Sequence, residues 1–136
     1  MRILVIDDDP FMTQLASLTL QGRGHAVSTA DCGAAALQKL SEPAPHLVLL
    51  DLGLPDIPGI EVARRFRAVD AWRDTKILML TASDSMSDIV LAKANGVSGY
   101  LCKPIAPETL GERVDEVLGE ADLLWIDDFT RARRAV

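Results

Sequence analysis

Residues 47–55 read Leu-Val-Leu-Leu-Asp-Leu-Gly-Leu-Pro, a short apolar run that ends on an aspartate and is followed by turn residues. Such runs are typical of strands buried on both faces, as in parallel sheets. Three similar runs end on a reactive residue: 3–6 at Asp7, 77–80 at Thr81 and 99–102 at Lys103. Because ligands bind outside the carboxyl ends of parallel strands, the pattern predicts one site that combines carboxylates, a hydroxyl and an ammonium.

Strand and helix signals alternate five times along the chain. Strands are predicted at about 2–6, 26–30, 46–51, 76–80 and 98–102, and helices at about 10–22, 33–41, 85–95 and 107–119, with a further helix after Gly59. Five such units predict an α/β fold with right-handed crossovers, a doubly wound, flavodoxin-like parallel sheet. The strand at 26–30 is weak and carries nothing reactive at its end, which favours an edge position and the order 2-1-3-4-5.

The spacing of apolar residues predicts which face of each helix is buried. In the first helix Phe11, Leu15 and Leu18 follow the i, i+4, i+7 pattern, and in the last helix Leu110, Val114 and Val117 do the same. We expect both sets to face the sheet.

Length and charge restrict the class of protein. The chain has 136 residues, enough for one domain with a full core, and a net charge of −6. That charge argues against direct binding of nucleic acid, which requires a basic surface. No apolar stretch approaches the length of a membrane span, and the apolar run after Met1 is too short for a signal peptide. We therefore expect a cytoplasmic protein without a membrane partner.

Two cysteines, Cys32 and Cys102, are expected to be free thiols. In the predicted strand order they lie at opposite edges of the sheet, separated by four strand spacings or about 19 Å. A disulfide requires Cα atoms within about 7 Å, so neither a disulfide nor a shared metal is expected.

The pattern changes near the C-terminus. We expect one domain at residues 1–120 and a tail or linker at 121–136, which lacks a sixth strand–helix unit. A competing hypothesis places Leu124, Trp125 and Phe129 on a helix face, in cis or in a dimer, because large apolar residues are unusual in a solvated tail.

The carboxylates are the strongest site candidates. Consecutive aspartates disfavour a strand, so stability alone does not explain Asp7 and Asp8, although a solvated turn with Asp9 as helix cap is the simpler alternative. Mg²⁺ binds one or two carboxylates together with phosphate oxygens. Asp51 ends the central strand and is the best candidate for a nucleophile toward phosphorus. Gly53 can offer only its backbone carbonyl as a metal ligand.

Thr81 and Lys103 complete the predicted site. A lone threonine after a strand is usually a loop residue, but its hydroxyl can donate to a phosphoryl oxygen. The Lys103 ammonium can pair with Asp51 at rest and with phosphoryl oxygens afterwards. A cis Lys103–Pro104 bond is a further expectation.

The chain resembles the receiver domain of two-component response regulators over about residues 2–119. The resemblance rests on the acidic pair at 7–8, Asp-x-Gly-x-Pro at 51–55, Thr81-Ala82, and Gly-Tyr-Leu-Cys-Lys-Pro at 99–104. These motifs are weak singly and highly specific in this order.

The resemblance implies a role for each residue. Asp51 would accept a phosphoryl group from a histidine kinase, a phosphotransfer protein or a small donor such as acetyl phosphate. Asp7, Asp8, Asp51 and the Gly53 carbonyl would hold Mg²⁺, for which Mn²⁺ could substitute, and Thr81 and Lys103 would bind the phosphoryl oxygens. The protein would not be an enzyme, because it would assist only its own phosphorylation and dephosphorylation. Gly53 replaces a residue that is often larger and polar, which leaves the phosphoryl lifetime open.

The resemblance also implies a switch. Thr81 would move toward the phosphate and Tyr100 would turn inward behind it, remodelling the surface formed by the fourth helix, fifth strand and fifth helix. An unidentified downstream protein, or a second copy in a phosphorylation-linked homodimer, would bind there.

Two alternatives stay open. Asp7-x-Asp9 also resembles the first motif of haloacid-dehalogenase-type phosphohydrolases, with Asp7 as nucleophile, Asp9 as general acid and Asp127-Asp128 as the later acidic pair. That interpretation leaves residues 51–55 without a role, and no strand that could join the sheet is expected before Asp127. Alternatively, the chain is a receiver from a larger protein, such as a DNA-binding regulator, a nucleotide cyclase or a hybrid kinase.

Overall fold

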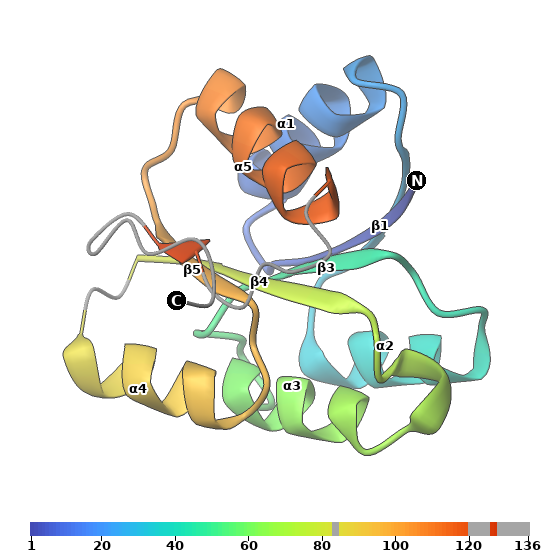
Figure 1. Cartoon of the computed structure of the whole chain (residues 1–136), viewed down its shortest axis with the longest axis vertical. Coiled ribbons are helices and arrows are strands. Elements are labelled where there is room, and N and C mark those ends of the chain that lie inside the picture. The colour runs from blue at the N-terminus through green and yellow to red at the C-terminus, as the bar shows by residue number, and fades with distance from the viewer. Residues whose placement is uncertain (83–84, 120–125, 128–136) are drawn as a thin grey trace.

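The computed structural model describes residues 1–82, 85–119 and 126–127, in which helices cover both faces of a parallel sheet (Figure 1). The strand order is β2-β1-β3-β4-β5-β6. Its first five members confirm the predicted order. The strands are β1 (Arg2–Ile6), β2 (Ala26–Ala30), β3 (Leu47–Leu50), β4 (Lys76–Thr81), β5 (Gly99–Cys102) and β6 (Ile126–Asp127).

Helices cover both faces of the sheet (Figure 1). The first face is covered by α1 (Pro10–Gly22) and α5 (Pro107–Gly119), and the second by α2 (Gly33–Gln38), α3 (Gly59–Arg67) and α4 (Met86–Ala94). Single turns of 3₁₀ helix, η1 (Lys39–Ser41) and η2 (Asp70–Trp72), follow α2 and α3.

Alternation along the strands divides the core into two clusters. Ile3 and Val5 of β1 pack toward α1 and α5, whereas Leu4 and Ile6 pack toward the other three helices. Burial on both faces explains why these strands are continuous apolar runs. On α5 the predicted inward residues, Leu110, Val114 and Val117, are fully buried, as expected.

The predicted buried face of α1 is only partly correct, because Leu15 packs against the core but the other two predicted residues do not. Met12, Ala16 and Leu20 are buried, whereas Phe11 is 72% exposed and Leu18 is 62% exposed. Both sets have helical spacing, so periodicity alone does not choose between them. The Asp9 side chain accepts a hydrogen bond from the Phe11 backbone N–H at 3.0 Å and Pro10 begins the helix, which together determine its start.

The tail contributes a strand that was not expected. Ile126 and Asp127 of β6 pair in parallel with Gly99 and Tyr100 of β5. A two-residue strand gives almost no sequence signal, and its backbone covers part of an edge that would otherwise present unpaired polar groups. The argument that no strand precedes Asp127 is therefore wrong. Asp128 and the hypothesis about Leu124, Trp125 and Phe129 fall outside the described residues.

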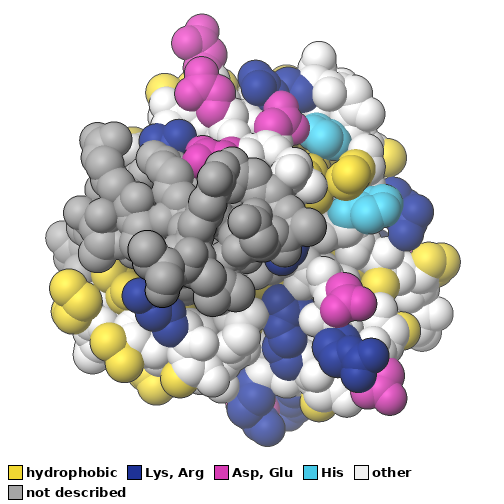
Figure 2. Space-filling model, viewed as in Figure 1, with side chains coloured by type: hydrophobic (Ala, Val, Ile, Leu, Met, Phe, Trp, Pro, Cys, Tyr) yellow, Lys and Arg dark blue, Asp and Glu magenta, His cyan; other side chains and the backbone are white. Residues whose placement is uncertain are grey.

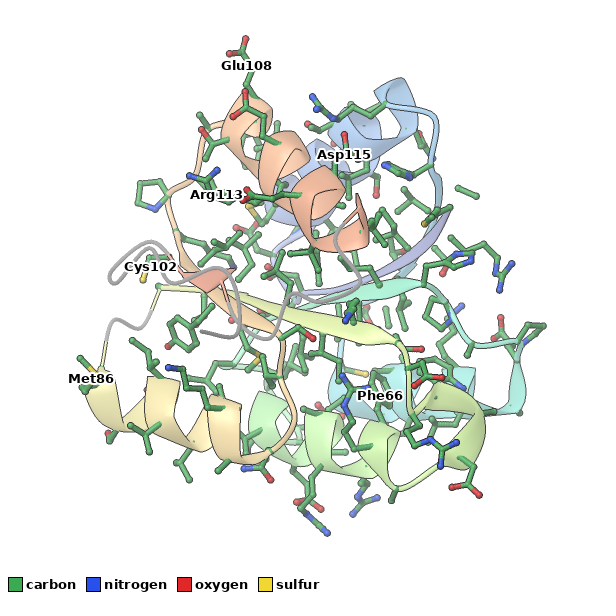
Figure 3. The ribbon with its side chains drawn as sticks, viewed as in Figure 1. Phe66, Met86, Cys102, Glu108, Arg113 and Asp115 are labelled. Carbon is green, nitrogen blue, oxygen red and sulfur yellow. The ribbon has the colours of Figure 1, made fainter. Side chains whose placement is uncertain are left out.

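Several smaller expectations are confirmed. Cys32 and Cys102 are free thiols, and the Lys103–Pro104 bond is cis. Among the described residues no helix is long and apolar enough to cross a membrane. Phe66 lies beneath the sheet (Figure 3), with its ring centroid 4.7 Å from that of the buried Trp72. The second helical segment spans the predicted residues, but α2 ends at Gln38 and its last turn is the 3₁₀ helix η1.

Candidate functional site

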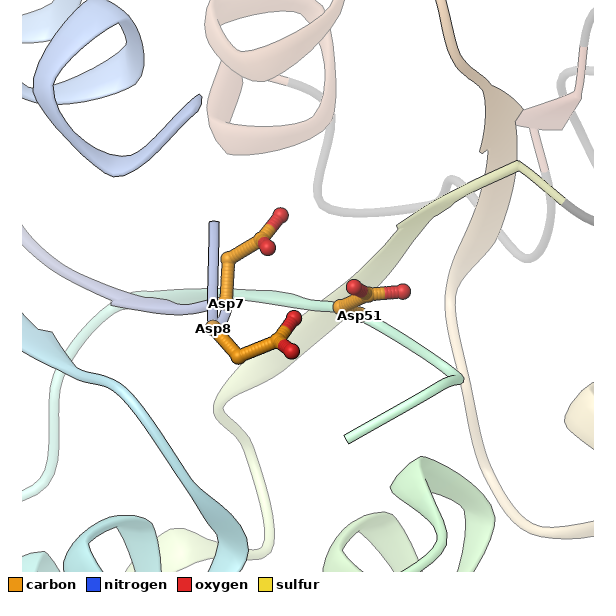
Figure 4. A group of neighbouring side chains, drawn as sticks. All are labelled: Asp7, Asp8 and Asp51. Atoms are coloured by element: carbon orange, nitrogen blue, oxygen red, sulfur yellow. The ribbon is translucent and has the colours of Figure 1, made fainter. Parts of the chain in front are cut away.

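Three carboxylates meet at the carboxyl ends of two neighbouring strands. Asp7 follows β1 and Asp51 follows β3, and the Asp51 backbone N–H donates to the Ile6 carbonyl at 2.9 Å. Asp7, Asp8 and Asp51 each offer one oxygen within 4.8 Å of the others (Figure 4). Asp7 and Asp51 are buried, whereas Asp8 is exposed. Like charges are therefore brought together at the mouth of the site, as predicted.

Lys103 provides the positive charge of the site. Its Nζ lies 2.7 Å from Asp7 Oδ2 and 3.4 Å from Asp51 Oδ2. The expected pair with Asp51 is present, but Asp7 is the nearer partner. The Lys103 backbone N–H donates to the Thr81 carbonyl at 2.8 Å, so the ends of β4 and β5 are held together. One ammonium thus pairs with two of the three carboxylates, and acidic groups outnumber it in the cluster.

Asp7 and Lys103 form the closest ion pair of the site, and burial and charge shift the pKa of both groups. Burial raises the pKa of the Asp7 carboxyl above its ordinary value, and the negative charge of Asp51 raises it further. The hydrogen bond from Lys103 lowers this pKa but does not outweigh burial. Burial lowers the pKa of the Lys103 ammonium, but the hydrogen bond to Asp7 and the charges of Asp7 and Asp51 outweigh it and raise the pKa. Lys103 is therefore held as a cation beside the acids.

Thr81 and Tyr100 occupy the two strands beyond Asp51. Thr81 ends β4 and is buried, and Tyr100 in β5 is fully buried. In the β4–β5 register Thr81 pairs with Cys102, which lies two residues after Tyr100. Tyr100 is thus buried in this structure, and its inward turn on phosphorylation stays a prediction. Any movement of Thr81 and Tyr100 remains a prediction.

Two glycines shape the loop after Asp51. The Gly53 backbone N–H donates to Asp51 Oδ1 at 3.2 Å, and a Cβ added at Gly53 would meet nothing within 4 Å. A Cβ added at Gly59 would instead collide with the Asp51 carbonyl oxygen and lie 2.8 Å from Leu52 Cα. Sequence reasoning treated Gly59 only as a loop residue. Its combination with Pro58 marks a tight approach, but the partner is visible only in the fold.

Asp56 and Thr13 also position the site and were not predicted. Asp56 accepts hydrogen bonds from the Gly33 and Ala34 backbone N–H groups at 2.7 and 2.9 Å, which joins the loop after Asp51 to the first turn of α2. These bonds lower the pKa of Asp56. The Thr13 hydroxyl donates to the Asp7 carbonyl at 3.2 Å. No motif in the sequence connects these residues.

The chain belongs to the response regulator receiver domain family, because residues 3–115 match the sequence model of that family. It is 41% identical over 113 residues to the DNA-binding response regulator MtrA of Mycolicibacterium smegmatis, an alignment that covers 83% of this chain and 48% of that protein. The chain thus spans about half the length of the curated relatives it matches.

Solved structures agree with the family. A CheY-like receiver domain protein from Methanospirillum hungatei JF-1 matches with a TM-score of 0.83 and 29% identity, over 88% of this chain and 94% of that one. The chemotaxis response regulator CheY4 of Vibrio cholerae matches with a TM-score of 0.81 and 34% identity, over 85% and 97%. The chain is therefore a response regulator receiver domain of two-component signalling.

Proposed function

We propose that this receiver accepts a phosphoryl group at Asp51 in a Mg²⁺-dependent reaction, from a histidine kinase or a phosphotransfer protein. The observation that carries the proposal is the convergence of Asp7, Asp8, Asp51 and Lys103 at one edge of the sheet. Each group is one that binding or transferring a phosphoryl group requires.

The donor atoms suit Mg²⁺. Asp7, Asp8 and Asp51 supply carboxylate oxygens within 4.8 Å of one another, and the Gly53 carbonyl is the proposed fourth donor. Hard oxygen donors are the ligands that Mg²⁺ prefers, and Mn²⁺ could substitute. Because Asp8 is exposed, the site leaves room for the waters that Mg²⁺ retains. When bound, the metal supplies positive charge that offsets the phosphoryl oxygens and the acidic cluster.

Burial and ion pairing favour Asp51 over Asp7 as the nucleophile. Asp7 accepts the shortest hydrogen bond from Lys103 and is 4% exposed, whereas Asp51 lies 3.4 Å from that ammonium and is 8% exposed. In the proposed transfer the P–N bond of the donor phosphohistidine breaks as an Asp51 carboxylate oxygen bonds to phosphorus. Lys103 and the Thr81 hydroxyl then bind the phosphoryl oxygens, and the chain assists only its own phosphorylation and dephosphorylation.

The surface of α4, β5 and α5 is the proposed output surface. Met86, Val90 and Leu91 of α4 are 65%, 58% and 49% exposed, and apolar side chains gather over α4 in Figure 2. Thr81 and Tyr100 lie between this surface and the phosphate site, so we propose them as the switch. A downstream protein or a second copy of the chain would bind the apolar side chains.

A second candidate is that the chain is the receiver part of a longer DNA-binding regulator. MtrA is named as such a regulator, and this chain spans 48% of its length. The expectation that nucleic acid is not a partner therefore lacks support. A cytoplasmic location and the division into a domain at 1–120 and a tail at 121–136 remain predictions.

Intact mass spectrometry after incubation with acetyl phosphate and Mg²⁺ tests the proposal. We expect one added phosphoryl group on the wild type and on Asp31→Asn, an exposed control, and none on Asp51→Asn or with a chelator. An adduct that persists in Asp51→Asn would overturn the assignment and favour Asp7. If the wild type shows no adduct, binding of beryllofluoride separates rapid hydrolysis from loss of the phosphoacceptor role.

A further inference from the structure

The two-residue strand β6 covers the edge of the sheet that carries one of the proposed switch residues. Ile126 and Asp127 pair in parallel with Gly99 and Tyr100, the first two residues of β5. The other side of β5 pairs with β4 along its whole length. β6 therefore lies on the side of β5 that would be the outer edge of the sheet without it (Figure 1).

β5 connects the phosphate site to this edge within a few residues. Lys103 follows the strand directly, and its backbone N–H donates to the Thr81 carbonyl at 2.8 Å. Tyr100 lies three residues before Lys103 and is paired with Asp127 of β6. Because a strand rises about 3.3 Å per residue, only about 10 Å of chain separates the two. A displacement of Lys103 at the site therefore acts on the strand to which β6 is attached.

The pairing of β6 is short enough to be displaced. Strands in globular proteins usually have about 3–10 residues, whereas β6 has two. Six residues connect Gly119, the end of α5, to Ile126, and a short tether gives an effective concentration on the order of 1 mM. Elements that move in switches come from the least stable parts of a fold. A longer strand that pairs with all four residues of β5 can therefore replace β6.

The edge under β6 suits an extended polypeptide. Edge strands present backbone N–H and C=O groups, and many proteins bind extended peptides by adding them as a further strand. The structure already places a parallel strand beside Gly99 and Tyr100. Tyr100 belongs to the core cluster under α4, whose Met86, Val90 and Leu91 are exposed. Because side chains of a strand alternate between the two faces, apolar residues at every second position would lie on the α4 side.

We propose that the β5 edge is a strand-addition site for an extended segment of the downstream protein, and that β6 occupies this site until Asp51 is phosphorylated. The inference rests on the proposed function, to which it adds the mode of binding at the output surface and its regulation. Binding of the phosphoryl group draws Lys103 away from Asp7, the end of β5 shifts, and β6 is released. The partner strand then pairs with β5 in its place.

Hydrogen exchange of the full chain tests the release of β6. Amide exchange at residues 99–102 and 126–127 is measured in Mg²⁺ alone and with added beryllofluoride, which stands in for the phosphoryl group. We expect exchange in both strands to become about tenfold faster with beryllofluoride. Intact mass after acetyl phosphate reports separately whether Asp51 is phosphorylated. An adduct without a change in exchange would overturn this inference alone, whereas the absence of both an adduct and beryllofluoride binding would overturn the proposed function with it.

Proline variants separate β6 from the rest of the tail. Ile126→Pro together with Asp127→Pro removes both backbone N–H groups of β6, so exchange at the β5 edge should be about tenfold faster without beryllofluoride. Beryllofluoride should add nothing further in this variant. Ala132→Pro together with Ala135→Pro places two prolines in the tail outside β6 and should behave as the wild type does. Wild-type exchange in the first variant would show that β6 does not protect the edge.

A peptide with the sequence of residues 121–136 tests strand addition by a separate chain. At about 1 mM, near the effective concentration of the tether, it should restore protection of Gly99 and Tyr100 in the β6 proline variant and in the beryllofluoride-bound wild type. The wild type without beryllofluoride, whose edge is occupied, should bind the peptide about tenfold more weakly. The peptide carrying both β6 proline substitutions should protect neither protein. Failure of the unmodified peptide to protect Gly99 and Tyr100 would overturn the assignment of this edge as a strand-addition site.

Discussion

Lys103 donates its shortest side-chain hydrogen bond to Asp7, at 2.7 Å. The ammonium therefore compensates the carboxylate that burial penalises most, while its distance to Asp51 is 3.4 Å. A cation that rests on Asp7 leaves Asp51, the proposed phosphoacceptor, less firmly engaged. This relationship leads to the first prediction.

Lys103→Met should destabilise the metal-free protein by about 1–3 kcal/mol, because Asp7 then lies buried without its counter-charge. Addition of Mg²⁺ should stabilise the variant more than the wild type, since the metal replaces the lost positive charge. Thermal unfolding with chelator and with Mg²⁺ measures both effects. Lys39→Met, which removes only a 3.7 Å pair with an exposed glutamate, should leave both values unchanged. Equal stability of Lys103→Met and the wild type in chelator would contradict the prediction.

Gly59→Ala should destabilise the fold by about 1–3 kcal/mol, because the new methyl group collides with the backbone at Asp51 and Leu52. Gly53→Ala is the matched control, because it lies in the same loop and its added Cβ would meet nothing within 4 Å. Urea denaturation measures both. Equal urea midpoints for the two variants would show that the loop gives way without cost.

Asp115→Asn should remove a pH-dependent part of the stability. Asp115 on α5 (Figure 3) accepts hydrogen bonds from Arg23 Nε at 2.7 Å and from His25 Nε2 at 2.8 Å. Burial raises the pKa of its carboxyl, but these two partners outweigh it and lower the pKa below the ordinary 3.8. The contribution is therefore complete above pH 3.8 and disappears as the pH falls through the lowered pKa.

Denaturation across this pH range should show a stability difference between wild type and Asp115→Asn that shrinks as the solution becomes more acidic. Since the carboxylate is 40% exposed, solvent limits the difference to about 1 kcal/mol or less. Glu108→Gln on the same helix is the control, and its curve should run parallel to that of the wild type. A difference that grows on acidification has the wrong sign and refutes the assignment.

Deletion of residues 121–136 should expose the edge of β5, because β6 is removed. We expect faster amide hydrogen exchange at Gly99–Cys102 and more self-association in sedimentation experiments, since an unpaired strand edge can pair with another chain. Deletion of residues 129–136 alone keeps β6 and should preserve the wild-type behaviour. Unchanged exchange and oligomeric state after the longer deletion would show that the tail does not dock.

The strand order and the placement of the acidic residues could be predicted because buried parallel strands have an unmistakable composition. Four apolar runs each end on a residue with reactive chemistry, and the topology brings those ends to one edge. Once the sheet is recognised, Asp7, Asp51, Thr81 and Lys103 follow almost directly. Their proximity needs no knowledge of side-chain packing.

Other features depend on contacts that periodicity does not record. In α1 two apolar stripes have helical spacing, and the fold buries Ala16 and its neighbours rather than Phe11 and Leu18. The two-residue β6 has no periodicity to detect. The ranking of Asp7 above Asp51 as partner of Lys103 depends on differences of less than 1 Å, which only the folded chain shows.

Arg67 of α3 donates from its guanidinium to the carbonyls of Gly96 and Trp72, both at 3.0 Å. Burial lowers the pKa of this arginine. One side chain thus joins α3, η2 and the turn after α4, three segments that are distant in the sequence. A substitution at this one position would therefore loosen three segments at once.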